Sequence, residues 1–567
     1  MNLRLSFGAI LMILSAVCAG QASNPDPVHS IDEIFQKWNE PDTPGCALGV
    51  KHPGAAPLIR SYGSADLEHD VPVSDSTVFE AGSVSKQFVA AAILMLAEKG
   101  ELSLTDDLRK YFPEMPVYDS PITIEELLGH TSGLRDWGDV EGMAGWPRTS
   151  RIYTLDDVLA IAARQKSLNY RPGTAYSYTN TGFNLLAIIV ARISKQSLAD
   201  FTHDHLFVPL GMSHTQWRDD FTRVVKGRAI AYEDSREGYH QEMPFENAYG
   251  NGGLLTTVGD LLRWNDALSA GELGPFVTRE ITRQTKLENG KTIAYARGLF
   301  IQSYHGTREI SHSGATAGYR AWLGRYPDQQ LSVALLCNAS DANTTALARA
   351  VADQFLPAPA SPSPASVVTL SAEQLRQYVG LYVDREKGLS LRLAVRDGSL
   401  SLPEGRVLTA MSPADFTVGT RTFRFSGGEH LTVESVDGSV SEYIRMQPWQ
   451  PSAKELASLA GTYKSDEALA TYDVRVKDGQ LVMTPVDRRG YSIALKPLAT
   501  GIFVMDTGDE SFVRFNRGGT KGVVDLEMSN GRVYSLRFRR AAPVGLAAPK
   551  LDSDIPRNPR QRLSPVT

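Results

Sequence analysis

Between residues 28 and 355, apolar positions follow two different periods along the chain. Spacings of three and four residues, typical of a helix face, run through the middle, whereas both ends carry short strand-like runs. The segments "CALGVKH" and "LIRSYGSADL" predict strands near the start, and "REISHSG", "YRAWLGRYP" and "LSVALLCNAS" predict strands near the end. Helices are predicted over Lys86–Lys99, Ile124–Leu128, Leu155–Arg164, Asn180–Ile193 and Val258–Leu268, and over the closing segment "DANTTALARAVADQFL".

Strands at both ends with helices between them predict an α/β (α+β) domain over residues 28–355. Its sheet, mixed or antiparallel, is built from both ends of the segment, and the helical stretch forms an insertion. The chain of 567 residues is too long for one hydrophobic core, so further domains are expected.

The chain changes character after residue 355. Residues 356–368, "LPAPASPSPASVV", predict a linker. Beyond them, short alternating runs are separated by turn signals such as "RDG", "VDG", "KDG" and "SNG". "SAEQLRQYVGLY" from Ser371 matches "SAKELASLAGTY" from Ser452, and "VRDGSL" matches "VKDGQL" at the same offset. This repeat predicts two all-β antiparallel barrel-like domains, residues 369–449 and 450–540, followed by a disordered tail over 541–567.

Residues 1–22 have the pattern of a secretory signal peptide. One charge, Arg4, precedes an apolar run of about 13 residues, short for a bilayer span, and the small-residue segment "CAGQAS" follows. We therefore expect a secreted or periplasmic protein. A lipid anchor at Cys18 is disfavoured, because Val17 is bulky where a small residue is expected. No other segment of the sequence has the length and apolarity of a membrane span.

Composition narrows the choice of partners. The chain is 42% hydrophobic and 22% charged, and its net charge of -6 without a basic block argues against nucleic acid. No Cys or His spacing indicates a metal site and no glycine-rich phosphate loop is present, so no cofactor is expected. After export only Cys46 and Cys337 would remain. We favour the interpretation that each of these cysteines is a small, buried, apolar residue in a strand. A disulfide between them is the alternative.

The segment "FEAGSVSKQF" places Ser83 at the mouth of the first long helix, with Lys86 three residues on. Residues i and i+3 share a helix face, and a helix N-terminus favours developing negative charge. A serine is a poor nucleophile without a base, and burial lowers the pKa of a lysine toward that role. On this tetrapeptide alone, a helix cap followed by a solvated lysine is the more frequent explanation.

Tyr178 and Asn180, in "YSYTNTGF", stand directly before and at the start of another predicted helix. The tyrosine would take the serine proton and pass it to a leaving group, provided that a cation such as Lys86 lies beside it, because an ordinary tyrosine pKa is about 10. Asn180 would donate its amide to a substrate carbonyl and accept from the lysine. A turn with an Asn helix cap is the alternative.

His312 and Gly314, in "EISHSGATAGY", end a predicted strand. Such a strand edge would line a cleft and bind substrate backbone, and the N–H groups of Ala315 and Ser83 would form an oxyanion hole. A strand histidine satisfied by its neighbours is the alternative for His312.

Taken in order, "GSVSKQF", "LLGHTSGL", "YSYTNTGFNLL", "NGGLLTTVGDLLRW" and "HSGATAGY" resemble the penicillin-recognising serine hydrolases, in particular the class C β-lactamase branch with its D-aminopeptidase and esterase relatives. The resemblance covers about residues 28–356 and implies a two-lobed domain with the site between the lobes. It implies Ser83 as the acylated nucleophile, with Lys86 and Tyr178 as its catalytic partners. It implies substrate-binding roles for Asn180, His312, Gly314 and Ala315.

Two further features of these motifs receive structural interpretations. His130, in "LLGHTSGL", matches the family pattern, and we expect it to support the fold. Residues 251–253, "NGG", predict a tight turn near the rim of the cleft.

His312 departs from many β-lactamases and transpeptidases, which carry Lys there to help hold a substrate carboxylate. A histidine is mostly uncharged near neutral pH, and His-x-Gly is similar to the D-aminopeptidase type. That type also carries two C-terminal β-barrel domains, one of which sends a loop into the cleft. The resemblance therefore implies an exported serine hydrolase that forms an acyl-enzyme with small peptides or amides containing D-amino acids.

Two other functions remain open at this level. A β-lactamase or carboxylesterase would use the same machinery, and a non-catalytic penicillin-binding or sensor protein would use the fold alone. The expected partner is a small-molecule or peptide substrate. The sequence does not indicate an oligomeric state.

Overall fold

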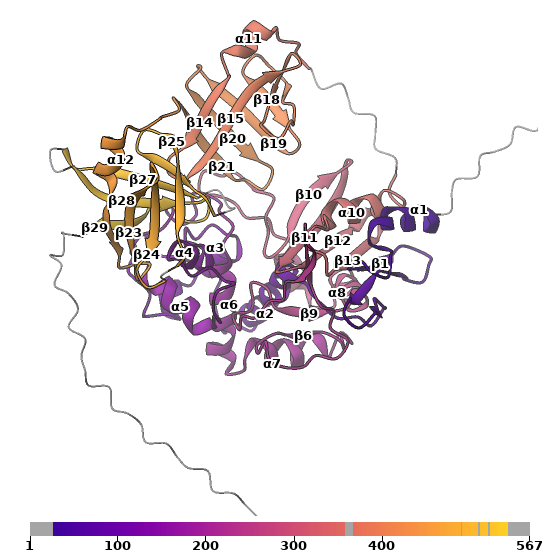
Figure 1. Cartoon of the computed structure of the whole chain (residues 1–567). Helices are drawn as coiled ribbons and strands as arrows, with labels where there is room; N and C mark the ends of the chain where they lie inside the picture. Colours follow the sequence, from indigo (N-terminus) through magenta and orange to yellow (C-terminus); the bar gives the residue numbers. More distant parts are fainter. Residues whose placement is uncertain (1–26, 358–366, 489, 508–510, 520–521, 542–567) are drawn as a thin grey trace, which may run out of the picture.

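The computed structural model describes residues 27–357, 367–488, 490–507, 511–519 and 522–541. Figure 1 shows an α/β domain, coloured indigo to pink, beside two β-rich domains in orange and yellow. The predicted signal peptide (1–22) lies outside the described residues, as do most of the predicted linker (356–368) and nearly all of the predicted tail (541–567).

A six-stranded sheet forms the centre of the α/β domain. Its strands are β1 (Cys46–Lys51), β2 (Leu58–Tyr62), β10 (Phe300–Tyr304), β11 (Thr307–Thr316), β12 (Tyr319–Tyr326) and β13 (Leu331–Cys337). They lie in the order β10-β11-β12-β13-β1-β2, and the pairing of β1 with β13 joins the beginning of the domain to its end. The sheet is thus built from both ends, as predicted, and of the two expected forms it is the antiparallel one.

Helices cover both faces of this sheet. On one face, α1 (Pro27–Ile34) and α10 (Thr344–Ala352) share a core with β1 and β13. On the other, α8 (Val258–Ala270) and α2 (Lys86–Glu98) belong to the main core. The sequence of α2, "KQFVAAAILMLAE", is apolar nearly all round, which explains why this helix runs through the interior. Its first residue, Lys86, is therefore carried into the core.

In the sequence, the helical insertion lies between strands β1–β2 and strands β10–β13 of the sheet. It contains α3 (Ile124–Leu128), α4 (Trp137–Met143), α5 (Leu155–Arg164), α6 (Asn180–Ser194), α7 (Leu198–Thr202) and α9 (Pro275–Ile281). Every predicted helix is present, whereas α1, α4, α7, α9 and the edge strand β10 were not predicted. The shorter strands are β3 (Ser64–Asp66), β4 (Val71–Pro72), β5 (Phe79–Glu80), β6 (Gln216–Trp217), β7 (Tyr232–Ser235), β8 (Gly238–Gln241) and β9 (Leu254–Thr256).

Cys46 and Cys337 are cross-strand partners in β1 and β13, and they form a disulfide. Our preference for two unlinked cysteines is therefore wrong, although both are fully buried within strands as expected. The two residues are 291 positions apart. The two cysteines meet only because β13 pairs with β1, and the spacing of the cysteines in the sequence does not reveal that pairing.

The first β domain is an eight-stranded antiparallel sheet in the order β16-β15-β14-β21-β20-β19-β18-β17. The second forms a closed barrel from β22 to β29. The strands of the first are β14 (Gly380–Asp384), β15 (Leu389–Arg396), β16 (Ser399–Ser401), β17 (Thr409–Ala410), β18 (Asp415–Val418), β19 (Arg421–Ser426), β20 (His430–Ser435) and β21 (Val440–Met446). Those of the second are β22 (Gly461–Ser465), β23 (Ala470–Lys477), β24 (Gln480–Pro485), β25 (Ile493–Ala499), β26 (Ile502–Met505), β27 (Phe512–Arg517), β28 (Val523–Ser529) and β29 (Leu536–Arg540).

The sequence repeat has a structural counterpart in each β domain. A short helix, α11 (Ala372–Arg376) or α12 (Ala453–Leu459), starts at a serine capping box. The matching tyrosines, Tyr382 and Tyr463, each donate a hydrogen bond to the carbonyl four residues upstream. The prediction of two β-rich barrel-like domains is confirmed.

The second barrel packs directly on the helical insertion. One hydrophobic cluster contains Trp137 and Tyr153 of the α/β domain together with Tyr472 and Phe538 of the barrel, and Figure 1 shows α4 and α5 beside the yellow strands. A shared core of this kind fixes the barrel relative to the cleft. Among the described residues, no helix has the length and apolar character needed to cross a membrane.

Candidate active site

Ser83 lies in the 3-10 turn η2 (Gly82–Ser85), directly before α2, and lines a cleft of about 610 Å³. Its Oγ lies 3.0 Å from Lys86 Nζ and 2.7 Å from the phenol oxygen of Tyr178. The amine comes from the same turn of chain, and the phenol comes from the segment before α6. The predicted nucleophile therefore has both predicted proton-transfer partners within hydrogen-bonding reach.

Lys86 is buried in the interior, and its amine has three neighbours. Nζ lies 3.0 Å from Asn180 Oδ1, 2.6 Å from the carbonyl oxygen of Asn251 and 3.0 Å from Ser83 Oγ. Burial lowers the pKa of Lys86 well below its ordinary value, and the carboxylate of Asp136 opposes this only in part. A neutral amine has two N–H donors for the two carbonyl oxygens and one lone pair for the serine hydroxyl. The geometry therefore suits Lys86 as the base that accepts the Ser83 proton.

Tyr178 donates a hydrogen bond to Ser83 Oγ, and its ring lies 4.8 Å from Lys86 Nζ. Burial raises the pKa of Tyr178, whereas the bond to Ser83 and the charge of Arg532 lower it. The phenol is consequently protonated before a substrate binds. This modifies the expected role: Tyr178 is placed to give a proton first, and Lys86 is the group that takes the serine proton.

Asn180 is the first residue of α6, and both its backbone and its side chain form hydrogen bonds. Its backbone N–H donates to Asp136 Oδ2 at 2.6 Å, and its side-chain Oδ1 accepts from Lys86. The amide nitrogen Nδ2 remains on the cleft side, where Asn180 is a lining residue. It is thus oriented to donate to a carbonyl of a bound substrate.

Gly314 at the end of β11 lies against η2 with no room for a side chain. A Cβ on Gly314 would come within 2.0 Å of the Ala81 carbonyl oxygen and 3.1 Å of the Ser83 nitrogen. Gly82 has φ +50°, and a Cβ there would meet the Ala315 nitrogen at 2.6 Å. These two glycines let β11 approach the serine turn closely. The backbone N–H groups of Ser83 and Ala315 lie near each other as a result, which is the arrangement of an oxyanion hole.

His312 is 3% exposed and forms the wall of the cleft beside Gly314. Its Nδ1 lies 2.6 Å from the Ser313 carbonyl oxygen, so this nitrogen carries the proton, and Nε2 lies 3.3 Å from the hydroxyl of Tyr295, from which it accepts. Burial, aided by the charge of Lys86, lowers the pKa of His312 to about 3. The imidazole is therefore neutral and offers no charge to a substrate carboxylate.

His130 has a supporting position beneath Tyr178. The ring centroids of His130 and Tyr178 are 4.2 Å apart, and His130 Nδ1 accepts from the N–H of Thr179 at 3.3 Å. Its carbonyl also accepts hydrogen bonds from Ser177 N and the Tyr170 hydroxyl. The residue fixes the segment that carries Tyr178, in agreement with the structural interpretation.

Both β domains contribute to the cleft. Arg532, in the turn between β28 and β29, and Asp437, in the turn between β20 and β21, line the same cavity as Ser83. The arginine's guanidinium carbon lies 5.3 Å from the centroid of the Tyr178 ring. The D-aminopeptidase type that the motifs resemble sends a loop of one barrel into the cleft, and in this structure one turn from each β domain lines it.

A family model described as Beta-lactamase matches residues 31–357. The chain belongs to the beta-lactamase family. Penicillin-binding protein 4* of Bacillus subtilis is 29% identical over 294 residues, which span 49% of this chain and 64% of that protein. A D-aminopeptidase of Cereibacter sphaeroides is 27% identical over 453 residues, 77% of this chain and 82% of its own. An octameric penicillin-binding protein homologue from Pyrococcus abyssi shares the fold: the match covers 90% of this chain and 98% of that one, with 20% identity and a TM-score of 0.51.

These relatives confirm the resemblance found in the sequence motifs, and they confirm that this beta-lactamase-family protein is a serine hydrolase. The fold implied by the resemblance, including the C-terminal β domains, is confirmed as well.

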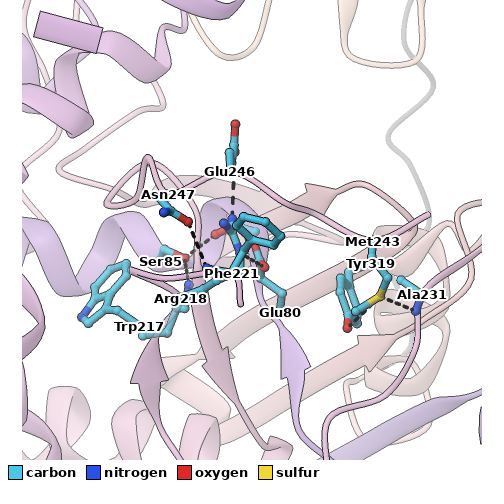
Figure 2. Close-up of polar contacts among 12 residues, drawn as sticks. Glu80, Ser85, Trp217, Arg218, Phe221, Ala231, Met243, Glu246, Asn247 and Tyr319 are labelled. Atoms are coloured by element: carbon cyan, nitrogen blue, oxygen red, sulfur yellow. Dashed lines mark hydrogen bonds and ion pairs between the residues drawn. The ribbon is translucent and has the colours of Figure 1, made fainter. Parts of the chain in front are cut away.

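A network of arginines and glutamates, mostly buried, supports the cleft of this beta-lactamase-family protein. Arg148 lines the cleft and donates to Glu246 at 2.9 Å, Arg218 lies 3.9 Å from Glu246, and Arg218 donates to Glu80 at 2.7 Å. Figure 2 shows Arg218 between the two glutamates. Because Glu80 stands three residues before Ser83, the network ties the serine turn to Arg148, whose charge helps to lower the pKa of Lys86.

Sequence reasoning missed several residues of this beta-lactamase-family site. The turn at 251–253 was predicted, but the role of its carbonyl as a Lys86 partner was not. Arg532 directly follows "SNG" and Asp437 lies within "VDG", and both segments were visible as turn signals only. The missed residues are Arg148, Asn251, Tyr295, Asp437 and Arg532.

Proposed function

We propose that this protein is an exported serine hydrolase that cleaves amide bonds in small peptides or amides containing D-amino acids, through an acyl-enzyme on Ser83. The observation that carries the proposal is the position of Ser83 Oγ between an amine of lowered pKa and a phenol. The D-aminopeptidase relative, whose match extends over 77% of the chain, supports the substrate class. The signal pattern of residues 1–22 supports export.

In the proposed acylation step, Ser83 Oγ attacks the carbonyl carbon while its proton moves to Lys86 Nζ. The N–H groups of Ser83 and Ala315 stabilise the negative charge on the carbonyl oxygen. The carbon–nitrogen bond then breaks as Tyr178 gives its proton to the leaving amine, and the Lys86 ammonium returns a proton to the phenolate. The products are an ester on Ser83 and a free amine, and both catalytic groups are back in their starting forms.

Deacylation repeats this chemistry with water as the nucleophile. Water attacks the ester carbon, its proton passes to the Lys86–Tyr178 pair, and the carbon–oxygen bond to Ser83 breaks as the serine recovers a proton. The released product is a carboxylic acid. The oxyanion hole acts again, because the same carbonyl oxygen becomes negative.

A β-lactamase or esterase would use the same groups. The Bacillus subtilis relative is named a penicillin-binding protein, so acylation by penicillin is a second candidate activity. The neutral His312 favours the amide substrates, since it gives no cation at the place where many β-lactamases hold a carboxylate. Arg148, Arg320 and Arg532 also line the cleft, so any positive charge offered to a substrate carboxylate comes from these arginines and not from His312.

The first experiment tests the nucleophile. A fluorescent penicillin or fluorophosphonate should label the purified protein and should not label Ser83→Ala, whereas Ser103→Ala, a change at an exposed loop serine, should label normally. Equal labelling of wild type and Ser83→Ala would remove the proposed mechanism.

The second experiment ranks the substrates. We expect kcat/KM for D-alanyl-p-nitroanilide to exceed that for L-alanyl-p-nitroanilide, and we expect weaker turnover of nitrocefin and p-nitrophenyl butyrate. Nitrocefin as the best substrate would assign the protein to the β-lactamases. Labelling of Ser83 without turnover of any of the four compounds would favour a binding or sensor protein.

A further inference from the structure

A second cavity, of about 860 Å³, opens between the central sheet and the ends of α8 and α9. Its walls come from the β1–β2 connection, the starts of β11 and β13, the end of β12 and the two helices. It shares no lining residue with the cleft around Ser83. The volume is that of a site for a small molecule.

Arg325 reaches this cavity from the interior of the sheet. It sits on β12 between Ile310 of β11 and Ser332 of β13, and the residue is 5% exposed. Within the described parts of the chain, its guanidinium donates no hydrogen bond to a protein acceptor and forms no ion pair. Its nitrogens are not sealed by protein atoms, so they face the cavity. Burial, together with the charge of Arg308, lowers the pKa of Arg325 to about 10.

This environment is unlike that of the other buried arginines. Four arginines are buried in the described residues, and three of them are paired with a carboxylate: Arg135 with Glu467 at 2.7 Å, Arg218 with Glu80 at 2.7 Å and Arg297 with Glu280 at 2.5 Å. Placing a charge in the interior without a partner is costly. Arg325 is the exception among the four, and it is the one that faces a large cavity.

Arg308 brings to the same cavity a second guanidinium that has no partner among the described residues. It lies on β11 two residues before Ile310, the cross-strand partner of Arg325, so both arginines project from one face of the sheet. Diagonal neighbours of this kind are about 7–8 Å apart. Glu309, between Arg308 and Ile310, faces the other side, where it pairs with Arg349 at 2.8 Å.

The acidic residues of the cavity do not neutralise this pair of arginines. Asp266 is held by Lys51 at 2.6 Å. Glu272 also lines the cavity, but it forms no ion pair with either guanidinium. Neither guanidinium is therefore paired with a carboxylate of the described residues, although Glu272 shares the cavity.

We propose that this cavity binds the phosphate group of a small molecule between Arg308 and Arg325. Guanidinium forks match phosphate oxygens in geometry, and a phosphate monoester carries the two negative charges that the two arginines lack. Ser332 also lines the cavity, and its hydroxyl supplies a donor for a remaining oxygen. A cavity of about 860 Å³ leaves room for the group esterified to the phosphate.

Calorimetric titration of the full chain with inorganic phosphate, phenyl phosphate and benzoate tests the proposal. We expect one phenyl phosphate per chain, bound at least about tenfold more tightly than benzoate, with inorganic phosphate competing for it. Arg325→Met and Arg308→Gln should each weaken phenyl phosphate binding by about tenfold or more. Arg60→Gln, a change on β2 of the same sheet, should bind as the wild type does.

Thermal melting gives a second readout. Without ligand, Arg325→Met should melt at or above the wild-type temperature, because the change removes an unpaired buried charge. With phenyl phosphate, the wild-type melting temperature should rise and that of Arg325→Met should not. Absence of binding to the wild type, equal binding of benzoate, or wild-type affinity in both arginine variants would overturn the proposal. If Arg325→Met does not fold, the exposed Arg308→Gln decides the question alone.

Discussion

Arg532 of the second barrel lies over the ring of Tyr178, the phenol that contacts Ser83, with 5.3 Å between the guanidinium carbon and the ring centroid. The turn that carries Arg532 is fixed to the α/β domain, since its backbone carbonyl accepts from Asn169 Nδ2 at 2.8 Å. The barrel thus supplies a positive charge beside a proton-transfer group. That charge lowers the pKa of Tyr178 against the effect of burial.

Arg532→Gln should slow amide hydrolysis. Without the guanidinium, a negative charge on Tyr178 is less stable, and we expect kcat/KM for D-alanyl-p-nitroanilide to fall about tenfold, the effect of roughly one pKa unit. Arg537→Gln, on the neighbouring strand β29 and paired with Asp525 at 2.5 Å, is the control and should leave the rate unchanged. An Arg532 variant with the wild-type rate would limit the turn to a structural role.

Lys86→Met should remove the proposed base while keeping the volume of the side chain. General-base catalysis contributes about 10²–10⁴ in rate, so the second-order rate of labelling by a fluorescent penicillin should fall by that factor. Lys99→Met changes an exposed lysine just beyond the end of α2 and should label at the wild-type rate. Rapid labelling of Lys86→Met would assign the base role to another group.

His312 should make the protein less stable in acid. Its pKa is about 3 in the folded chain and 6.5 ordinarily, so between these values the unfolded state binds one more proton. The contribution of His312 to stability is complete above pH 6.5 and is lost as the pH falls toward 3, with a slope of up to about 1.4 kcal/mol per pH unit. Urea denaturation at pH 4, 5, 6 and 7 should show a shallower pH dependence for His312→Gln than for the wild type. The exposed His430→Gln should keep the wild-type slope.

The meeting of the residues around Ser83 was predictable because the signals for it are local or ordered. Ser83 and Lys86 share one turn of chain, and the apolar pattern of α2 sets the burial that lowers the lysine pKa. Tyr178 and His312 were expected near that turn because the motifs that contain them occur in the same order as in the family. No periodicity in the sequence places those segments side by side.

The residues that were not predicted depend on long-range pairing. Arg148 gains its position from Glu246, about a hundred residues later, and Arg532 depends on the packing of a whole barrel against α4 and α5. The unpaired state of Arg325 is invisible in sequence for the same reason, since it results from the absence of an acid across two strands.

Arg135→Ala should loosen the second barrel from the α/β domain. Arg135 is buried and pairs with Glu467 of the barrel at 2.7 Å, and its other guanidinium nitrogen donates to the Tyr534 carbonyl at 2.9 Å. Breaking a buried pair from one side costs about 3–5 kcal/mol, so the melting temperature should fall by several degrees. Arg475→Ala removes an exposed pair with Asp473 and should change stability by less than about 1 kcal/mol. Equal effects of the two variants would contradict a specific docking role for Arg135.

Removal of the Cys46–Cys337 disulfide should destabilise the central sheet. The bond closes a long loop and joins β1 to β13, the pair of strands that connects the two ends of the domain. For the double variant Cys46→Ala, Cys337→Ala we expect a loss of about 2–5 kcal/mol, measured by thermal melting. The wild type with a thiol reductant should shift toward the variant, whereas the variant itself should not respond to reductant. A wild-type melting temperature that is independent of reductant, with free thiols demonstrated by titration, would show that the bond contributes nothing. Since such bonds persist mainly in oxidising compartments, protein directed through the secretion pathway should contain the disulfide and protein retained in the cytosol should lack it.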